Sequence, residues 1–328
     1  MIAALYVEDA VRSLPRVQKI AQRFASLPVI RCERYTEVFN PRAQKFRAQK
    51  KRPSLILAHK FDGLVLPAPE GYGIGGRHNF YFSHMMNCLY DCRYCFLQGM
   101  YRSANYVLFV NYEDFLTTID TQLDTFAGEP VWFFSGYDCD SLALEPVSGF
   151  IKHTLPFFAE RPNARLEIRT KSTQIRELLM VEAISNAVVA FSFTPQALSR
   201  RLEHGVPSVD KRIAAMVRLQ RHGWRIGLRF DPLIYETNYE ALYRDMFIQI
   251  FGQVDCDALH SVSIGPFRMP RAYFKNILRL YPDEPLFAGP FENADGLVSY
   301  RQDLEDEMYD FCRNQICEYV PESALFAA

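Results

Sequence analysis

From about residue 79 onward, short β-rich runs alternate with longer stretches of helical periodicity, and this alternation constrains the fold more than any other feature. Apolar runs bounded by turn residues are typical of strands in a buried parallel sheet. The predicted strands are Phe80–Phe82, Val131–Phe134, Arg165–Thr170, Ala187–Phe193, Arg225–Phe230 and Ser261–Ile264. The predicted helices are about 112–126, 147–159, 174–184, 208–222, 239–252, 270–280 and 303–318. Repeated strand–helix units predict an α/β fold, and about six of them are too few for a closed eight-fold barrel.

No Gly/Ser-rich linker or internal repeat divides the chain, so we expect one catalytic domain with appended ends. Residues 1–78 are expected to form an N-terminal leader or accessory region, 79–270 the central domain, and 271–328 a C-terminal extension that completes it. The leader contains an amphipathic helix over Val11–Ala25 and a short apolar run at Leu55–Ala58. Between them lies a basic stretch that consists of Arg42, Lys45, Arg47, Lys50, Lys51 and Arg52.

Composition indicates a soluble globular protein, with 49% hydrophobic and 23% charged residues. The chain shows no secretory signal pattern and no apolar run long enough to span a bilayer, so we expect a cytoplasmic protein without a membrane segment. In that compartment its eight cysteines are thiols or metal ligands rather than disulfides. A net charge of −1 is not the balance of a typical nucleic-acid binder, although a local basic face would suffice.

Three cysteines, Cys88, Cys92 and Cys95, follow the first predicted strand with the spacing C-x3-C-x2-C. Three thiolates this close together can bind three irons of a 4Fe–4S cluster. The fourth iron is then left without a protein ligand, and an open coordination position is what a catalytic metal centre needs. The loop after the first strand of a βα series is also a place where ligands gather.

Two other interpretations of these cysteines remain open. A zinc site would need a fourth ligand, and His84, four residues before Cys88, is the candidate. The chain would then be a non-catalytic zinc or Fe–S binding module. Buried, inert cysteines are the other alternative, but three at this spacing rarely arise by chance in a cytoplasmic chain.

The cysteine spacing resembles that of the radical S-adenosylmethionine (SAM) superfamily. Similarity to one of its families, spore photoproduct lyase, runs through nearly the whole chain. It is carried by Cys88–Gln98, Asn111–Asp114, Arg169–Lys171, Phe191–Phe193 and Pro207–Ile213. The resemblance implies a partial (β/α)6 TIM-like barrel with an N-terminal leader and a C-terminal helical extension. It also implies a 4Fe–4S cluster and SAM as cofactors, and a reductant such as flavodoxin or ferredoxin.

The implied activity is that of a carbon–carbon lyase that repairs DNA. A 5′-deoxyadenosyl radical made from SAM would start the direct reversal of a thymine photolesion, 5-thyminyl-5,6-dihydrothymine, to two thymines. The lesion would be flipped out of the duplex, because its reacting atom is unreachable within the stack. A radical SAM enzyme of the same family acting on another nucleic-acid or small-molecule substrate is the alternative.

The resemblance assigns roles to five residues by their position in the family motifs. Cys88, Cys92 and Cys95 match the cluster ligands. Lys171 and Ser192 match residues that contact SAM, so Lys171 would pair with the SAM carboxylate and Ser192 would hydrogen-bond to SAM. The structural alternatives are a solvated lysine at a strand end and a serine that faces a helix.

Two departures from the family pattern concern hydrogen transfer. The family's hydrogen-donating cysteine aligns with Tyr137, whereas Cys139 stands where the family has a SAM-contacting serine. Tyr137 and Cys139 are therefore both candidate donors, and Cys139 is also a candidate SAM contact or a small buried residue. Of the two family tyrosines that flank the last cluster cysteine, Tyr94 matches the first, for hydrogen relay or packing. Phe96 occupies the second position and has no O–H to exchange.

The third departure lies in the C-terminal region, where the family has a basic hairpin that wedges into DNA. The matching stretch, residues 286–296, lacks Arg and Lys and carries two acids. Phosphate binding needs cations, so DNA contacts are expected elsewhere. The candidates are the basic stretch described above and a second group, with ordinary solvated charge as the alternative for each. This second group consists of Arg200, Arg201, Lys211 and Arg212.

Overall fold

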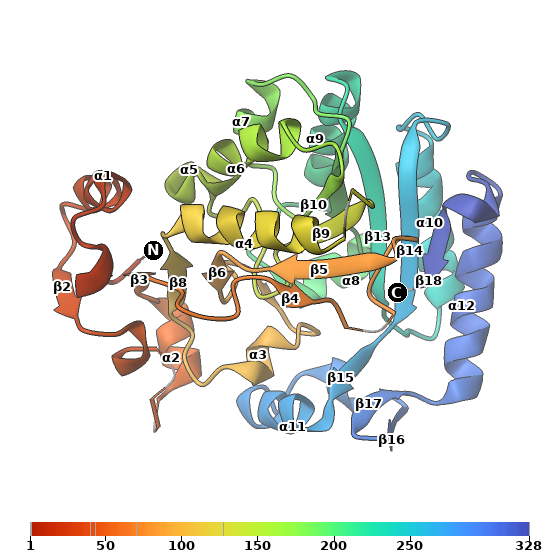
Figure 1. Cartoon of the computed structure of the whole chain (residues 1–328). Coiled ribbons are helices and arrows are strands. Elements are labelled where there is room, and N and C mark those ends of the chain that lie inside the picture. Colours follow the sequence, from red (N-terminus) through yellow and green to blue (C-terminus); the bar gives the residue numbers. More distant parts are fainter. Residues whose placement is uncertain (1, 40, 43, 70, 127, 328) are drawn as a thin grey trace.

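Two β-sheets organise the protein: a large curled sheet from the middle of the chain and a smaller sheet formed mainly by its beginning (Figure 1). The computed structural model describes residues 2–39, 41–42, 44–69, 71–126 and 128–327. Within these ranges, no helix combines the length and the apolar character that crossing a membrane requires.

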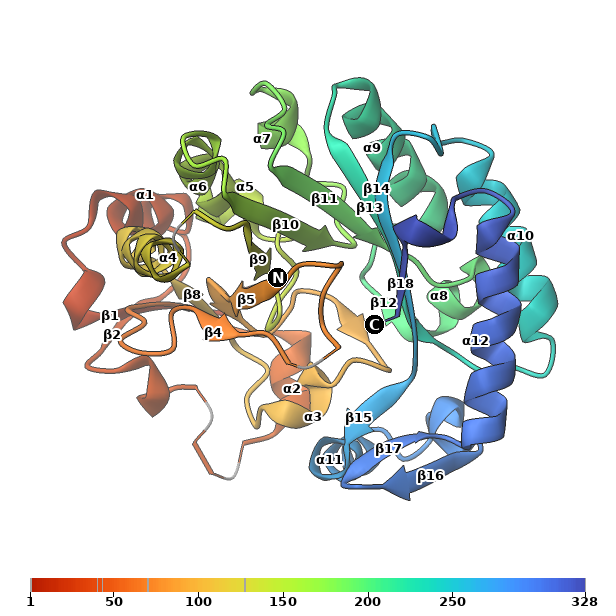
Figure 2. The same cartoon turned by 45° about the vertical axis from the view of Figure 1, so that its right-hand side comes forward.

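The large sheet has eight strands and curls into part of a barrel (Figure 2). In sheet order they are β18 (Leu325–Ala327), β14 (Leu259–Pro266), β13 (Arg225–Leu233), β11 (Ala187–Ser192), β10 (Ala164–Thr170), β9 (Val131–Ser135), β5 (His78–Phe82) and β4 (Leu66–Pro67). The six central strands, β5, β9, β10, β11, β13 and β14, each pair in parallel with their neighbours in this group. They correspond to the six strands predicted from the sequence. At the edges, β18 pairs in parallel with β14 and β4 is antiparallel to β5. The partial α/β barrel predicted from the sequence is confirmed.

Helices cover the outer face of this sheet (Figure 2). They include α4 (Tyr112–Thr125), α6 (Phe150–Ala159), α7 (Arg176–Leu179), α9 (Val209–Arg221), α10 (Tyr239–Phe251) and α12 (Gln302–Cys317). Helix α9 shows why they form: Ile213, Met216 and Leu219 recur at helical spacing and are fully buried. The side chain of Ser208 accepts a hydrogen bond from the backbone N–H of Lys211 and caps the first turn.

Two predicted helices differ from those observed. The helix expected over 147–159 is divided into α5 (Glu145–Ser148) and α6, because Gly149 between them has a left-handed φ of 59°. The helix expected over 174–184 is reduced to the single turn of α7. Met180, which follows α7, is 64% exposed, so its apolar side chain does not mark a helix face in the core.

The smaller sheet has the order β2–β1–β3–β8–β6. Its strands are β1 (Leu5–Glu8), β2 (Val29–Cys32), β3 (Leu55–Ala58), β6 (Met85–Met86) and β8 (Tyr106–Phe109). Only β6 runs antiparallel to its neighbour. Helix α1 (Pro15–Arg23) covers it and is shorter than the predicted helix over Val11–Ala25. Strands β6 and β8 lie on either side of the cysteine motif in sequence. This sheet therefore holds both ends of the stretch between them, residues 87–105, which is termed here the cysteine segment.

The C-terminal part adds a small antiparallel sheet below the barrel (Figure 1). It consists of β15 (Arg268–Pro270), β16 (Phe291–Ala294) and β17 (Leu297–Tyr300), with α11 (Arg271–Leu280) between β15 and β16. The turn between β16 and β17 has positive φ at Asp295 and Gly296, 51° and 81°. This Asp-Gly pair is typical of a tight hairpin.

Candidate active site

A cavity of about 610 Å³ lies where the parallel strands of the barrel end. Its walls include Gly136 after β9, Thr170 at the end of β10, Ser192 at the end of β11, and Asp231 near the end of β13. The eight residues predicted for the cluster, for SAM contact and for hydrogen transfer all line this cavity. These residues are Cys88, Cys92, Tyr94, Cys95, Tyr137, Cys139, Lys171 and Ser192. Ligands gather at this end of parallel α/β sheets, so the cavity is the candidate active site.

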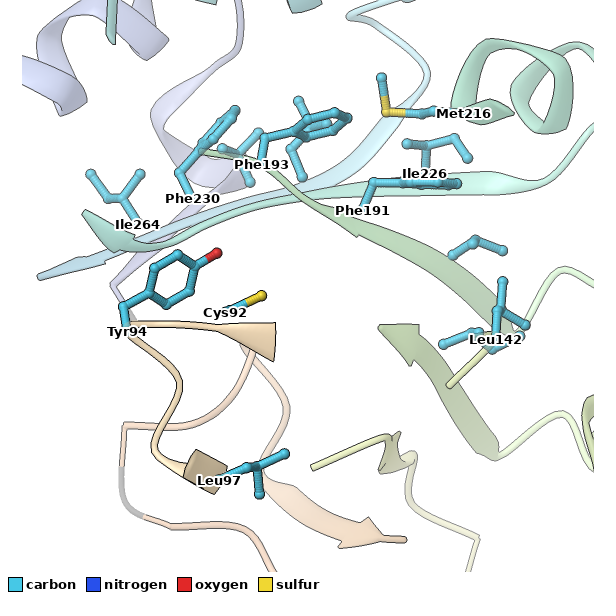
Figure 3. Close-up of a cluster of buried hydrophobic side chains, with 14 of the residues drawn as sticks. Cys92, Tyr94, Leu97, Leu142, Phe191, Phe193, Met216, Ile226, Phe230 and Ile264 are labelled. Atoms are coloured by element: carbon cyan, nitrogen blue, oxygen red, sulfur yellow. The ribbon is translucent and has the colours of Figure 1, made fainter. Parts of the chain in front are cut away.

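The three motif cysteines reach the cavity from a segment that is held at several points. Strand β7 (Asp91–Cys92) pairs with β12 (Glu203–His204). The Lys50 ammonium donates to the backbone carbonyls of Cys88 and Tyr90 at 3.3 and 3.2 Å. Figure 3 shows the side chains of Cys92 and Tyr94 directed toward the neighbouring strands. The cysteines are thus presented by a fixed backbone.

The surroundings of the cysteines fit a thiolate-bound cluster. Burial raises the pKa of all three thiols, and two lysines oppose that rise. Lys50 acts on Cys88 and Cys95, and Lys171 acts on Cys92 and Cys95. Cations near the cysteine triangle stabilise negative charge on thiolates that bind iron. The donor set and its electrostatic setting therefore suit a 4Fe–4S cluster.

The geometry does not favour the zinc alternative. In the part of the chain that the structure describes, no three His, Cys, Asp or Glu side chains gather closely enough to hold a single metal ion. His84 is buried and stacks on Phe150, with ring centroids 4.0 Å apart, instead of lining the cavity with the cysteines.

A buried carboxylate, Glu203, connects the cysteine segment to the barrel. It accepts hydrogen bonds from the hydroxyl of Tyr94, from Ser199 Oγ at 2.6 Å and from Arg212 at 2.6 Å. Lys171 Nζ lies 3.5 Å from Oε1 of Glu203, the oxygen that also accepts from Tyr94, whereas Ser199 and Arg212 donate to Oε2. Burial alone would raise the pKa of Glu203, but Lys171 and Arg212 lower it below its usual range. Glu203 is therefore ionised, and it positions a predicted SAM contact and a predicted hydrogen-relay residue together.

Arg212 was a candidate for DNA contact, and the structure shows that this expectation is wrong. Its side chain is fully buried, because it neutralises Glu203 and donates to the Ser192 carbonyl at 2.8 Å. A buried guanidinium of this kind is structural rather than available to phosphate. Its neighbour in the second basic group, Arg201, pairs with Glu236.

The loop that carries Tyr137 and Cys139 is organised by Asp140. Its carboxylate accepts hydrogen bonds from the backbone N–H of Lys171 at 2.6 Å and from Thr170 Oγ1 at 2.7 Å. It also accepts from the N–H groups of Leu142 and Ala143 at 3.0 and 2.8 Å. Asp140 thereby fixes the loop after β9 against the end of β10.

Tyr137 stands among other aromatic rings. Its ring centroid lies 4.4 Å from Tyr81, 5.5 Å from Tyr72 and 5.6 Å from Phe96. Burial raises the pKa of Tyr137, so the phenol keeps its hydrogen at neutral pH. Cys139 is only 9% exposed, and its thiol is hydrogen-bonded to the backbone of Met85. Burial, with a further contribution from nearby Cys88, raises the pKa of Cys139 well above its usual value.

The lower wall of the cavity is formed by the C-terminal elements. Arg268 and Pro270 of β15, Tyr273 of α11 and Leu297 of β17 all line it. The stretch 286–296 includes the β16 strand and the hairpin turn, as its alignment with the family hairpin suggested. Its acids Glu292 and Asp295 are exposed, so this hairpin offers phosphate no cation.

Helix α11, which begins at the cavity wall, supplies exposed cations that were not predicted from the sequence. Arg271, Lys275 and Arg279 recur every four residues and are exposed, whereas Phe274 and Ile277 face the protein. The spacing is visible in the sequence. Its meaning depends on the closeness of α11 to the cavity, which only the fold shows.

Comparison with known proteins decides the family. The family model for spore photoproduct lyase matches residues 80–286, which is more than half of the chain. The chain belongs to the spore photoproduct lyase family. Spore photoproduct lyase from Bacillus subtilis is 24% identical over 177 residues, 54% of this chain and 52% of that protein. The enzyme from Clostridium acetobutylicum is 22% identical over 255 residues, 75% of this chain and 76% of its own length.

Solved structures agree with this fold. A spore photoproduct lyase complexed with dinucleoside spore photoproduct superposes with a TM-score of 0.85 at 18% identity and covers 100% of this chain and 98% of that one. A variant of the lyase solved with bound AdoMet and the same dinucleoside gives a TM-score of 0.85, also at 18% identity. In sequence, the match spans about half the length of the Bacillus subtilis relative.

Proposed function

We propose that this protein is a radical SAM lyase that reverses the thymine photolesion 5-thyminyl-5,6-dihydrothymine in DNA. One observation carries the proposal. All eight residues that the family resemblance assigned to cluster, SAM and hydrogen transfer line a single cavity at the strand ends. Relatives in this family are named for the lesion, and one was solved with it bound as a dinucleoside. The same cavity would receive the flipped nucleotides here.

Cys88, Cys92 and Cys95 would hold the 4Fe–4S cluster, and the iron without a cysteine would bind SAM. When bound, the cluster and SAM together supply the 5′-deoxyadenosyl radical that removes one hydrogen atom from the lesion. Lys171 would pair with the SAM carboxylate, because its ammonium is near the cysteines and only 14% exposed. Ser192 would offer its hydroxyl from the end of β11. The anionic Glu203 holds the Lys171 side chain in place at the cavity wall.

We assign the hydrogen donor to Tyr137 rather than Cys139. Among the groups that influence the Tyr137 hydroxyl electrostatically are Tyr273 and Arg268 of the C-terminal wall, where DNA would enter. Cys139 is influenced by Cys88 and Asp140 and so lies on the cluster side. Cys139 therefore suits the SAM-contacting position. Tyr137 would give its hydroxyl hydrogen atom to the carbon radical of the repaired thymine. The tyrosyl radical left on Tyr137 would be returned to tyrosine by one electron from the reductant and one proton.

The role of Tyr94 in hydrogen relay stays a prediction. Its hydroxyl is already bound to Glu203 and lies 3.3 Å from Thr194 Oγ1, which fits positioning of the cysteine segment. Phe96 lies against Tyr137 at the point where the family has its second tyrosine. Tyr72 and Tyr81, which flank Tyr137, are the nearby phenols that can substitute for the missing hydroxyl.

Removing the Tyr137 hydroxyl should separate the start of the reaction from its completion. We expect Tyr137→Phe to keep SAM cleavage but to lower the yield of restored thymine by about 10²-fold, by analogy with loss of a positioned proton donor. Cys139→Ala should raise the SAM concentration needed for half-maximal rate while leaving the product unchanged. Chromatography of both nucleoside products would measure the two effects. Normal thymine yield from Tyr137→Phe, with altered products from Cys139→Ala, would reverse the assignment.

The cations of α11 are the proposed phosphate contacts for the duplex that flanks the lesion. A cavity of about 610 Å³ cannot hold a duplex, so the DNA backbone would extend over the helix that begins at its wall. Arg271→Ala/Lys275→Ala/Arg279→Ala should lower the magnitude of the slope of log affinity against log salt by about 0.9 for each phosphate that is no longer neutralised. Fluorescence anisotropy with a labelled duplex would measure it. Arg200→Ala/Lys211→Ala/Arg221→Ala, on α8 (Gln196–Leu202) and α9, removes the same charge and includes two members of the second basic group. Neither helix lines the cavity, so this variant should leave the slope unchanged, and a lowered slope would assign the phosphate contacts to the second basic group instead.

An anaerobic assay tests the proposed function as a whole. Reconstituted protein is mixed with SAM, dithionite and dinucleoside spore photoproduct, and 5′-deoxyadenosine and thymine are measured together. Both products are expected. Formation of 5′-deoxyadenosine without thymine would indicate a radical SAM enzyme with another substrate. Phe96 and the acidic hairpin, which depart from the family pattern, would then account for the change of substrate. Neither product from a cluster-loaded sample would contradict the proposal.

A further inference from the structure

The short helix α2 (Phe46–Lys51) lies directly against the backbone of the cysteine segment. Lys50 donates to the carbonyls of Cys88 and Tyr90. Gln49 Oε1 accepts a hydrogen bond of 3.0 Å from the backbone N–H of Ala104, on the strand side of the same segment. Helix α2 therefore contacts both the beginning of the cysteine segment and its exit toward β8.

The outer surface of α2 is strongly cationic. Lys45, Arg47, Lys51 and Arg52 are all exposed. Arg47 also places its guanidinium 5.7 Å from the ring centroid of Tyr281, at the far end of α11 from the cavity wall. These four residues, termed here the α2 patch, lie on and next to the short helix whose Lys50 contacts the cysteine backbone.

The position of the α2 patch argues against a role in holding the lesion. The cysteine side chains face the cavity, whereas Lys50 reaches the same segment through its backbone carbonyls. Of the three proposed DNA contacts, Arg271 and Lys275 lie on the first turns of α11, next to the cavity wall at Pro270, and only Arg279 lies on its last turn, near the α2 patch. The α2 patch thus approaches the proposed cluster site from the protein backbone and not from the substrate side.

We infer that the α2 patch is the docking surface for an acidic one-electron carrier protein, of the flavodoxin or ferredoxin class, that reduces the cluster. The inference rests on the proposed function, because a radical SAM centre needs one electron for each SAM cleaved. Electron-transfer complexes have small interfaces and are steered by complementary charge, and a compact group of four exposed cations is suited to this. One electron leaves the carrier, which is oxidised, and enters the cluster, which is reduced. No atom is transferred.

Charge reversal in the α2 patch should slow reduction by the protein carrier alone. The test variant is Arg47→Glu/Lys51→Glu, and the matched control with the same charge change is Arg271→Glu/Lys275→Glu on α11. Cluster-loaded protein is mixed anaerobically with reduced flavodoxin, and flavodoxin oxidation is followed by absorbance. At low salt we expect the α2 variant to react about 10-fold more slowly or worse, because loss of steering removes at least that factor. Reduction by dithionite should be unchanged.

A binding measurement gives a second readout that does not depend on the cluster. Affinity of cluster-free protein for oxidised flavodoxin, measured by calorimetry, should fall in the α2 variant and in high salt. The α11 control should bind flavodoxin normally and bind duplex DNA more weakly. Lys51→Glu/Arg52→Glu leaves the interaction between Arg47 and Tyr281 intact, and it replaces the first variant if circular dichroism shows a folding defect.

Three outcomes would overturn the inference: unchanged flavodoxin kinetics in both α2 variants, equal slowing with dithionite, or weaker DNA binding by the α2 variants. The last would assign the patch to nucleic acid. Failure of the proposed function is distinguishable, because absence of thymine repair leaves carrier binding and cluster reduction measurable. A patch that controls reduction without lesion repair would retain the docking surface and change only the substrate.

Discussion

Replacement of Cys92 by alanine is expected to abolish binding of the 4Fe–4S cluster. The side chain is 6% exposed and faces the cavity, and its backbone is paired with Glu203 in the β7–β12 bridge. Loss of one thiolate leaves two of the three cysteines, and the remaining protein ligands hold one fewer iron. Iron content and visible absorbance after anaerobic reconstitution should both fall to the level of protein without added iron. SAM cleavage should be undetectable.

Cys317→Ala is the control, because Cys317 is exposed on α12 and remote from the cavity. It should bind iron like the unaltered protein. Iron content and absorbance that survive in Cys92→Ala would refute the assignment of the cluster ligands. Circular dichroism separates loss of the ligand from loss of the fold.

Glu203→Ala should strongly lower the stability of the fold. It leaves the guanidinium of Arg212, whose side chain has no exposed surface, without its carboxylate. Removing one partner of a buried ion pair costs about 3–5 kcal/mol of the free energy of unfolding, because an uncompensated charge stays in the interior. Urea denaturation would measure the loss. The hydroxyl of Tyr94 loses its acceptor too, so the cysteine segment should bind iron less tightly.

The same carboxylate predicts a dependence on pH. The folded-state pKa of Glu203 is lowered below its ordinary value of 4.5 despite burial, since Lys171 and Arg212 favour the charged form. Its stabilisation is therefore fully present above about pH 4.5 and is lost as the pH falls through the lowered folded pKa. Glu203→Gln should show a smaller loss of stability on acidification than the unaltered protein. Parallel acid curves for the two proteins would exclude Glu203 as a contributor.

The barrel could be predicted from sequence because its strands are buried on both faces. Such strands appear as continuous apolar runs, as in Val131–Phe134 and Ala187–Phe193, and each is followed by a recognisable helix. In the smaller sheet that signal is incomplete: the apolar run Leu55–Ala58 is the buried strand β3, but the strands that pair with it could not be predicted from local pattern. In β2, Val29 and Ile30 are 52% and 39% exposed, and β8 pairs with β3 across some fifty residues of chain. Neither the exposed strand β2 nor the long-range pairing of β8 with β3 produces a pattern that can be recognised locally in the sequence.

The same difference between local and long-range signals decides which site residues could be predicted from the sequence. Cys88, Cys92 and Cys95 could be found because their chemistry depends on local spacing. Glu203 could not, because its contacts with Tyr94 and Lys171 join positions far apart in the sequence. The prediction of Arg212 as a surface charge failed for the same reason: its partner, nine residues away, is brought to it by the turn between α8 and α9. Contacts between side chains that are brought together by folding could be identified only from the structure.

The placement of β6 and β8 bears on how this protein can be divided. Both strands follow residue 78 in the chain, yet they belong to the same sheet as β1, β2 and β3. A fragment that starts at β5 would therefore keep β6 and β8 but lose the three strands that complete their sheet. Four buried residues of β8 would become an open edge, of the kind that recruits other chains. The cysteine segment would then be anchored to that edge. Modular reuse of the barrel in a fusion protein would therefore have to include the N-terminal sheet.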